Sequence, residues 1–306
     1  MKVGINILNF GPGTDPDALR SWTTFAERAG FSLAMLSDHV ALTEDVDALY
    51  PAPFYEPFST LAWLAGVTDR LELGTTVAIV PYRNPILTAQ MAANIDRFSN
   101  GRFVFGVGVG WSEPEFAALG VPFERRGAIT DEYLAAVKEL WTSDLASKEG
   151  EFVRFSDLRT GPRPQRGPHP PIWVGGSSRA ALRRAVTYGD AWHPINPRPG
   201  WVRAEGVVAL GAVAARAGRE VPRLCPRTRI RLTTSPLDDA DRLTGEGTLR
   251  QVLGDIEDFA DLGSDYVVLD PYLGPEQRRP PEEDWRTLET VVTALFKAGI
   301  ATPAQG

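Results

Sequence analysis

Eight short runs of β-branched, aromatic and other apolar residues recur along the chain, and longer segments with apolar residues at helical spacing separate them. The runs occupy residues 3–8, 31–36, 71–80, 102–110, 171–176, 190–195, 227–234 and 266–270. Because a parallel return between strands needs a crossover of a dozen or more residues, this alternation predicts parallel pairing. Eight such units predict one (β/α)8 TIM barrel over residues 1–306, since such a barrel uses about 250 residues as a single domain.

The intervening segments have the pattern of amphipathic helices. In the first of them, Leu19, Trp22 and Phe25 fall on one face, while Asp15 is placed to cap the start and Gly30 to end the helix. The competing architecture, a doubly wound sheet, often carries a Gly-rich fingerprint after its first strand. Here the first run is followed by NFGPGTDPD, which lacks G-x-G-x-x-G, so the barrel is favoured.

Two stretches interrupt the even spacing. Residues 148–171 contain EFVRF and TGPRPQRGPHPP, which are too rich in Pro and Gly for a helix. They predict a strand excursion and a loop inserted over the C-terminal barrel mouth. Residues 271–284 predict a second inserted loop, between the last strand and the last helix, which is either a mobile lid or a solvated connector.

Composition excludes several classes of protein. The 39 acidic and 32 basic residues give a net charge of -7 without a long block of either sign, whereas a nucleic-acid binder is usually basic. The single cysteine, Cys225, excludes an intrachain disulfide, and three histidines cannot complete a cysteine-rich zinc site. No run of about eighteen apolar residues suggests a membrane span. We expect a cytoplasmic protein with no metal that acts on a small-molecule substrate.

In such a barrel, functional residues gather where the strands end and the βα loops begin. Asp38 and His39 follow the second run, which places a carboxylate and an imidazole at the mouth. Because His titrates nearest to neutrality, this pair can donate, accept or shuttle a proton. The structural alternative is that Asp38 caps a loop and His39 packs beneath it. A glycosidase using Asp38 and Asp270 is another open reading.

Glycines mark the ends of the fourth and fifth runs. Gly175 and Gly176 lead through Ser177 into a helical segment, where backbone amides and a hydroxyl can cradle a phosphate. The segment GVGVGW, residues 106–111, has glycine at every second strand position, which permits close approach of a planar ring. Simple chain turning and barrel curvature are the alternatives. The candidates for a substrate pocket are Trp111, Trp192 and His193.

The segments at these positions together resemble the luciferase-like monooxygenase family. They are SDHV at 37–40, LELGTTVAIVPYRNP at 71–85, NGRFVFGVGVGWSEPEFAALGVPFERR at 100–126 and PIWVGGSSRAALRRA with YGDAWHP within 171–194. More narrowly, they are similar to the branch of the family that uses the deazaflavin coenzyme F420. The resemblance implies a (β/α)8 barrel with the cofactor at its C-terminal mouth, and a homodimer.

The resemblance also implies roles for individual residues. The cofactor ring would lie against a bulge in the third strand, with a non-prolyl cis peptide at Thr76–Val77. His39, oriented by Asp38, would act as acid or base. The residues assigned to the cofactor are Thr75, Thr76, Val77, Gly108, Val109, Gly110, Gly175, Gly176 and Ser177. One departure matters, because sugar-phosphate dehydrogenases of this branch carry a glutamate where this chain has Trp111, which argues against sugar-phosphate oxidation.

These implications lead to a predicted function. We expect an F420-dependent oxidoreductase that transfers a hydride between the deazaflavin C5 and a small organic substrate. An external reductase or F420-reducing enzyme would supply the reduced cofactor. Two alternatives remain open: an FMN-dependent two-component monooxygenase, and a barrel that binds a flavin or deazaflavin as a carrier without turnover.

Overall fold

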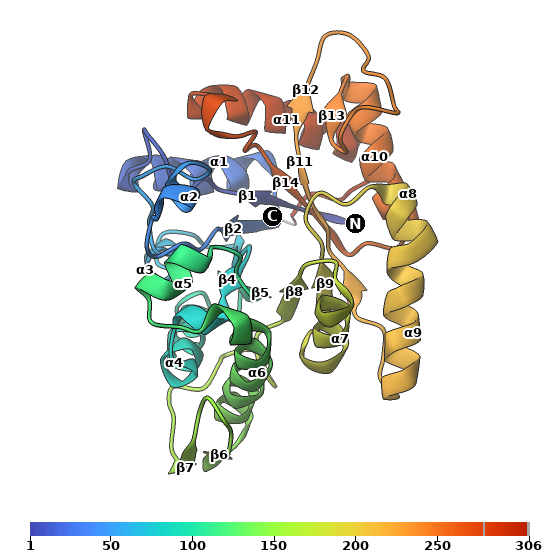
Figure 1. Ribbon diagram of the computed structural model, residues 1–306. Coiled ribbons are helices and arrows are strands. Elements are labelled where there is room, and N and C mark those ends of the chain that lie inside the picture. The colour runs from blue at the N-terminus through green and yellow to red at the C-terminus, as the bar shows by residue number, and fades with distance from the viewer. Residues whose placement is uncertain (278, 305–306) are drawn as a thin grey trace.

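Eight parallel strands form a barrel in the computed structural model, which describes residues 1–277 and 279–304 (Figure 1). In chain order they are β1 (Lys2–Asn6), β2 (Leu33–Leu36), β3 (Glu72–Thr75), β5 (Phe103–Gly108), β8 (Ile172–Gly175), β9 (Ala191–His193), the interrupted β10 (Arg223–Leu224) and β11 (Arg227–Arg229), and β14 (Tyr266–Asp270). Each contains or overlaps one predicted run, so the predicted barrel is confirmed. The short β4 (Ala78–Ile79) pairs with β5 beyond a bulge.

The seventh strand closes the barrel. The amide of Cys225 donates to the carbonyl of Trp192 on one side, and the carbonyl of Pro226 accepts from Val268 on the other, at 2.9 and 2.8 Å. This strand begins at Arg223, four residues before the predicted run. The sequence pattern misses its start because Arg223 is exposed and Pro226, which lacks an N–H, interrupts the ladder.

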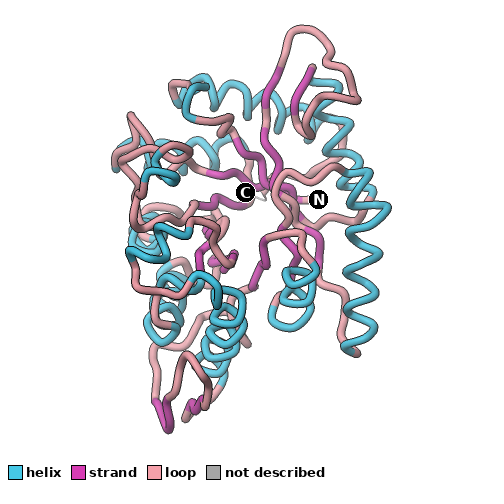
Figure 2. Tube along the Cα trace, viewed as in Figure 1, coloured by secondary structure: helices cyan, strands magenta, loops and turns pink. Residues whose placement is uncertain are grey.

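Helices surround the barrel (Figure 2). The outer layer consists of α1 (Pro16–Ala29), α3 (Pro57–Ala65), α4 (Pro85–Phe98), α6 (Arg126–Thr142), α7 (Arg179–Tyr188), α9 (Val207–Ala217), α10 (Leu249–Asp261) and α11 (Pro281–Lys297). The predicted ends of α1 are confirmed, since the Asp15 carboxylate accepts from Ala18 N and Gly30 adopts a left-handed φ of 85°. Among the described residues, no helix is long and apolar enough to cross a membrane.

Strand alternation divides the buried residues between two cores. Side chains that point into the barrel form a small cluster, and their strand neighbours join a larger cluster beneath the helices. The inner cluster comprises Leu33, Met35, Val104, Trp173, Ala191, Cys225 and Val268. Two consecutive residues of a strand therefore belong to different clusters, one inside the barrel and one beneath the helices.

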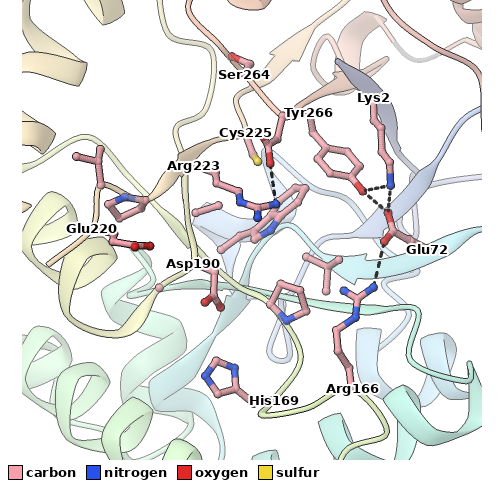
Figure 3. Close-up of a pocket in the computed structure, with 18 of the residues that line it drawn as sticks. Lys2, Glu72, Arg166, His169, Asp190, Glu220, Arg223, Cys225, Ser264 and Tyr266 are labelled. Carbon is pink, nitrogen blue, oxygen red and sulfur yellow. Dashed lines mark hydrogen bonds and ion pairs between the residues drawn. The ribbon is translucent and has the colours of Figure 1, made fainter.

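The first insertion lies at the other end of the barrel from the one predicted. Its hairpin, β6 (Ala146–Lys148) with β7 (Phe155–Leu158), projects beyond α6. The loop that follows places Arg166 and His169 in the lining of a cavity that also includes Lys2 and Tyr266, at the N-terminal ends of β1 and β14 (Figure 3). The prediction of a loop over the C-terminal mouth is wrong because residues immediately before a parallel strand must lie at its N-terminal end.

The second insertion does lie at the C-terminal end, directly after β14. Tyr272 packs edge-on against Phe10 and its hydroxyl donates to the Leu49 carbonyl. Residues 281–284 belong to the first turn of α11 rather than to a loop. The predicted segment also includes residue 278, which lies outside the described residues.

Candidate functional site

A cavity of about 400 Å³ opens at the C-terminal ends of the strands. It is mainly apolar, and its size is in the range of small-molecule sites. The predicted site residues that line it are Asp38, His39, Thr76, Val77, Gly108, Val109, Gly110, Trp111, Gly175, Gly176 and His193. Thr75, Ser177 and Trp192 do not line it.

His39 is held by a carboxylate that the sequence did not assign to it. Its Nδ1 lies 2.6 Å from Oε2 of Glu115, which comes from the short helix α5 (Glu113–Ala118). Glu115 is fully buried and also accepts from the hydroxyl of Tyr82 and the amide of Val40, both at 2.7 Å. Because the carboxylate only accepts, Nδ1 carries a proton and Nε2 is the ring nitrogen available to a ligand.

The electrostatics of Glu115 favour its charged form. Burial alone would raise the pKa of this carboxyl, but hydrogen bonds from His39, Val40 and Tyr82 outweigh it and the pKa is lowered. Burial raises the pKa of Tyr82 well above its usual range, and the hydrogen bond to Glu115 adds to this effect. Tyr82 therefore acts as a permanent donor to Glu115.

Asp38 has a different partner from the one predicted. Both of its oxygens accept from the guanidinium of Arg83, at 2.7 and 2.9 Å, and Oδ2 also accepts from Ile79 N at 2.8 Å. The prediction that Asp38 orients His39 is therefore wrong. Adjacent side chains at the end of a strand point in different directions, so Asp38 anchors the β3–β4 bulge while His39 turns toward α5.

The bulge after β3 has the predicted cis peptide at Thr76–Val77. Thr75, however, is fully buried, and its hydroxyl donates to the Gly106 carbonyl at 2.6 Å, so it does not reach the cavity. A Cβ on Gly106 would lie 1.8 Å from the Thr75 carbonyl oxygen, and one on Gly108 would lie 2.5 Å from Val77. The lack of a side chain at these two glycines thus leaves room for the bulge, and Gly108 also lines the cavity.

Thr76 is fixed by two buried side chains. Nδ1 of His193 lies 2.5 Å from the Cys225 carbonyl, so it carries the ring proton, and Nε2 accepts from the Thr76 hydroxyl at 2.9 Å. Burial, with Arg227 nearby, lowers the pKa of His193 to about 4, which keeps the ring neutral. Arg227 donates to the Thr76 carbonyl at 2.7 Å and pairs with Asp270.

The ion pairs that Asp38 and Asp270 each make with an arginine bear on the glycosidase hypothesis. Both oxygens of each carboxylate already accept hydrogen bonds within the chain, including those from Arg83 to Asp38 and from Arg227 to Asp270, so neither is free to donate to a glycosidic oxygen. Glycoside hydrolysis requires one protonated carboxylic acid. The observed hydrogen bonds and ion pairs therefore do not favour a glycosidase.

Aromatic side chains form the outer wall of the cavity. Trp111 is 43% exposed and packs edge-on against His39, and Tyr50 stacks on the His39 ring with ring centroids 5.3 Å apart. Trp192 is fully buried beneath the helices and is not a pocket wall, which corrects the prediction. Because Trp192 and His193 are neighbours on β9, only one of them can face the cavity.

The turn after β8, residues 175–178, combines a left-handed glycine with a capped helix start, and we call it the cradle. Gly176 adopts a φ of 95°, and Ser178 caps α7 by accepting from Ala181 N at 3.1 Å. A Cβ on Gly176 would lie 3.2 Å from the Ala181 Cβ. The exposed Ser177 follows, at the positive end of the helix. A phosphate-bearing flavin or deazaflavin fits this combination of glycine turn, capped helix and apolar cavity.

Sequence reasoning assigned no site role to three residues of the site: Glu115, Tyr82 and Arg227. The first had a usable signal, because Ser112 and Glu115 match the S-x-x-E pattern of a helix start. From that start, Glu115 and Phe116 share the buried face of α5, while Glu113 is exposed. Arg227 carried no local signal.

Comparison with known proteins gives matches to both the sequence and the fold. The sequence profile of the family described as luciferase-like monooxygenase matches residues 1–244. An FMNH(2)-dependent dimethylsulfone monooxygenase from Pseudomonas putida is 35% identical over 186 residues, covering 60% of this chain and 49% of that protein. The chain thus spans about half the length of that relative.

Two solved structures share the whole fold. A monooxygenase from Streptomyces bottropensis superposes with a TM-score of 0.81 and 22% identity, covering 98% of this chain and 100% of the other. A coenzyme F420-dependent tetrahydromethanopterin reductase from Methanopyrus kandleri gives a TM-score of 0.76 and 17% identity, covering 96% and 99%. These likenesses establish the fold, which this chain shares with a monooxygenase and with a coenzyme F420-dependent reductase.

Proposed function

The chain belongs to the luciferase-like monooxygenase family, and from this premise we propose that it is an F420-dependent oxidoreductase. The reaction would be hydride transfer between the deazaflavin and a small, uncharged organic substrate. The observation that carries the proposal is the His39–Glu115 pair, which presents one proton-handling nitrogen to a mainly apolar cavity. Hydride transfer to a carbonyl or imine takes up one proton, and hydride transfer from the corresponding alcohol or amine releases one.

The residues present define where the cofactor would be held. Gly175, Gly176 and Ser177 would receive its phosphate, while Thr76 and Val77 would contact its ring. When bound, F420 supplies a carbon centre that gives or takes a hydride. Gly108, Val109 and Gly110 line the same space.

The chain's own residues provide positioning and proton control. Glu115 orients His39, so that Nε2 can give a proton to a substrate oxygen or nitrogen, or take one from it. His193 and Arg227 hold the Thr76 side chain and carbonyl in place. Trp111 and Tyr50 limit access of water to His39 and favour an apolar or planar substrate.

The charges around the cavity support an uncharged substrate. Asp38 is paired with Arg83, and Arg227 with Asp270, so neither lining residue offers an unbalanced charge to a substrate. The neutral His193 adds no charge. An anionic substrate would lack a free cation among the lining residues.

A second function is favoured by one specific observation. The relative from Pseudomonas putida is named as FMNH(2)-dependent, and its matched segment covers 60% of this chain. An FMN-dependent two-component monooxygenase, supplied by an external reductase, is therefore the alternative. The family resemblance also supports a homodimer, which light scattering of the purified protein tests.

A paired calorimetric titration with F420 and FMN at one salt concentration tests both functions. Preferential F420 binding, followed by substrate-dependent change in its visible absorbance, supports the proposed function. Preference for FMN supports the monooxygenase. Cofactor binding without turnover across a broad panel of carbonyls, imines and alkenes indicates a carrier protein. If the protein binds neither cofactor, that result contradicts the proposed cofactor site.

A further inference from the structure

The cradle after β8 depends on a side chain that never enters the cavity. Trp192 is fully buried in the layer between barrel and helices, and its indole Nε1–H donates to the Gly176 carbonyl at 2.7 Å. Gly176 is the cradle residue with a left-handed φ of 95°. The indole therefore fixes the peptide that follows this unusual backbone position.

The surroundings of Trp192 hold the indole in this position. The chain passes from the short helix α8 (Pro199–Trp201) into a widened π-helical turn over Val202–Gly206 before α9 begins. A Cβ on Gly206 would lie 2.7 Å from the Trp192 ring, and Trp201 packs edge-on against the same ring at 6.1 Å. Single π-helical turns occur frequently beside functional sites.

We infer that Trp192 is a positioning residue for the phosphate of the cofactor. Its N–H holds the Gly176 peptide so that the amides following it point at the anion, and the π-helical turn at Gly206 leaves room for the indole. The inference rests on the proposed function and deepens it, since it assigns phosphate selectivity to a residue outside the cavity. It also explains why a tryptophan occupies the outward-facing position of β9.

The test compares each cofactor with its phosphate-free counterpart. Wild-type protein and Trp192→Phe are titrated with FMN and riboflavin, and with F420 and its phosphate-free deazaflavin core. We expect Trp192→Phe to weaken binding of the phosphate-bearing member of the pair that wild type binds by about tenfold, the equivalent of one lost hydrogen bond. Binding of the phosphate-free member should stay within about twofold.

A matched control is available elsewhere in the chain. Trp141 is also buried, and its Nε1–H donates to the Ala89 carbonyl at 2.8 Å, between α6 and α4 and outside the cavity lining. Trp141→Phe removes the same kind of bond and should leave both affinities unchanged. Gly206→Ala, which keeps the indole but crowds it, provides a second variant if Trp192→Phe does not fold.

The outcomes separate the inference from the proposed function. Loss confined to the phosphate-bearing ligand, in Trp192→Phe or Gly206→Ala but not in Trp141→Phe, supports the inference. Equal loss for both ligands, or no loss while wild type binds a phosphate-bearing cofactor, overturns the inference alone. Failure of the wild-type protein to bind any of the four ligands overturns the proposed function and the inference with it.

Discussion

The two ends of the barrel differ in how their charged groups are partnered. At the C-terminal end, Asp38, Glu115 and Asp270 are buried and each accepts several hydrogen bonds. At the N-terminal end, a larger cavity of about 860 Å³ (Figure 3) is lined by charged groups. They include Arg223 and Asp265, whose ion pair is exposed to solvent. The larger cavity is thus not the better candidate for the functional site. A functional site holds its polar groups in fixed positions, which requires that they be buried and hydrogen-bonded.

The largest expected effect comes from His39→Ala. Loss of the proton-handling nitrogen should lower turnover by about 100-fold or more, while cofactor affinity changes only a few-fold. Steady-state kinetics at saturating cofactor, together with a cofactor titration, measures both quantities. Weakened cofactor binding with unchanged turnover of the loaded enzyme would contradict the role of His39.

The next effect concerns stability at low pH. The pKa of His193 is about 4 in the folded protein, below the value of about 6.5 for an unfolded chain, so the unfolded state takes up the proton first as the pH falls. This group should therefore cost about 3 kcal/mol of stability between pH 6.5 and pH 4. Urea unfolding of wild type and His193→Gln across this range isolates the difference, and parallel curves would refute it.

A smaller effect is expected for Glu115→Gln. The amide keeps the volume but removes the charged acceptor that orients His39, which should lower turnover by about 10- to 100-fold. Glu113→Gln, two residues earlier on the exposed side of α5, is the control and should retain wild-type turnover. Similar losses in both variants would show that the effect comes from α5 as a whole.

The smallest effect is expected at the N-terminal end. Arg223→Ala breaks an exposed ion pair with Asp265 and should change stability by less than about 1 kcal/mol, with no change in turnover. Thermal unfolding and steady-state kinetics check the two quantities. A several-fold change in turnover would show that the two ends of the barrel are functionally connected.

Much of the fold could be predicted from the chain because its signals are local. Apolar runs with β-branched residues located the strands, and Asp15 and Gly30 marked the ends of α1. The insertion at 148–171 was recognised as an insertion but assigned to the wrong end of the barrel. Composition identifies a loop, whereas only its position before β8 determines which end it covers.

The candidate site shows the same difference between local signals and long-range contacts. The sequence by itself determined that His39, Thr76, Gly176 and His193 would stand at strand ends, since strand periodicity and βα order decide this. Only the tertiary structure decided that Glu115, 76 residues along the chain, holds His39, and that Trp192 supports Gly176 from behind. The physical reason is that a hydrogen bond between distant segments forms only when both side chains point in the right direction. Barrel closure and helix packing fix these directions, whereas the local sequence pattern does not.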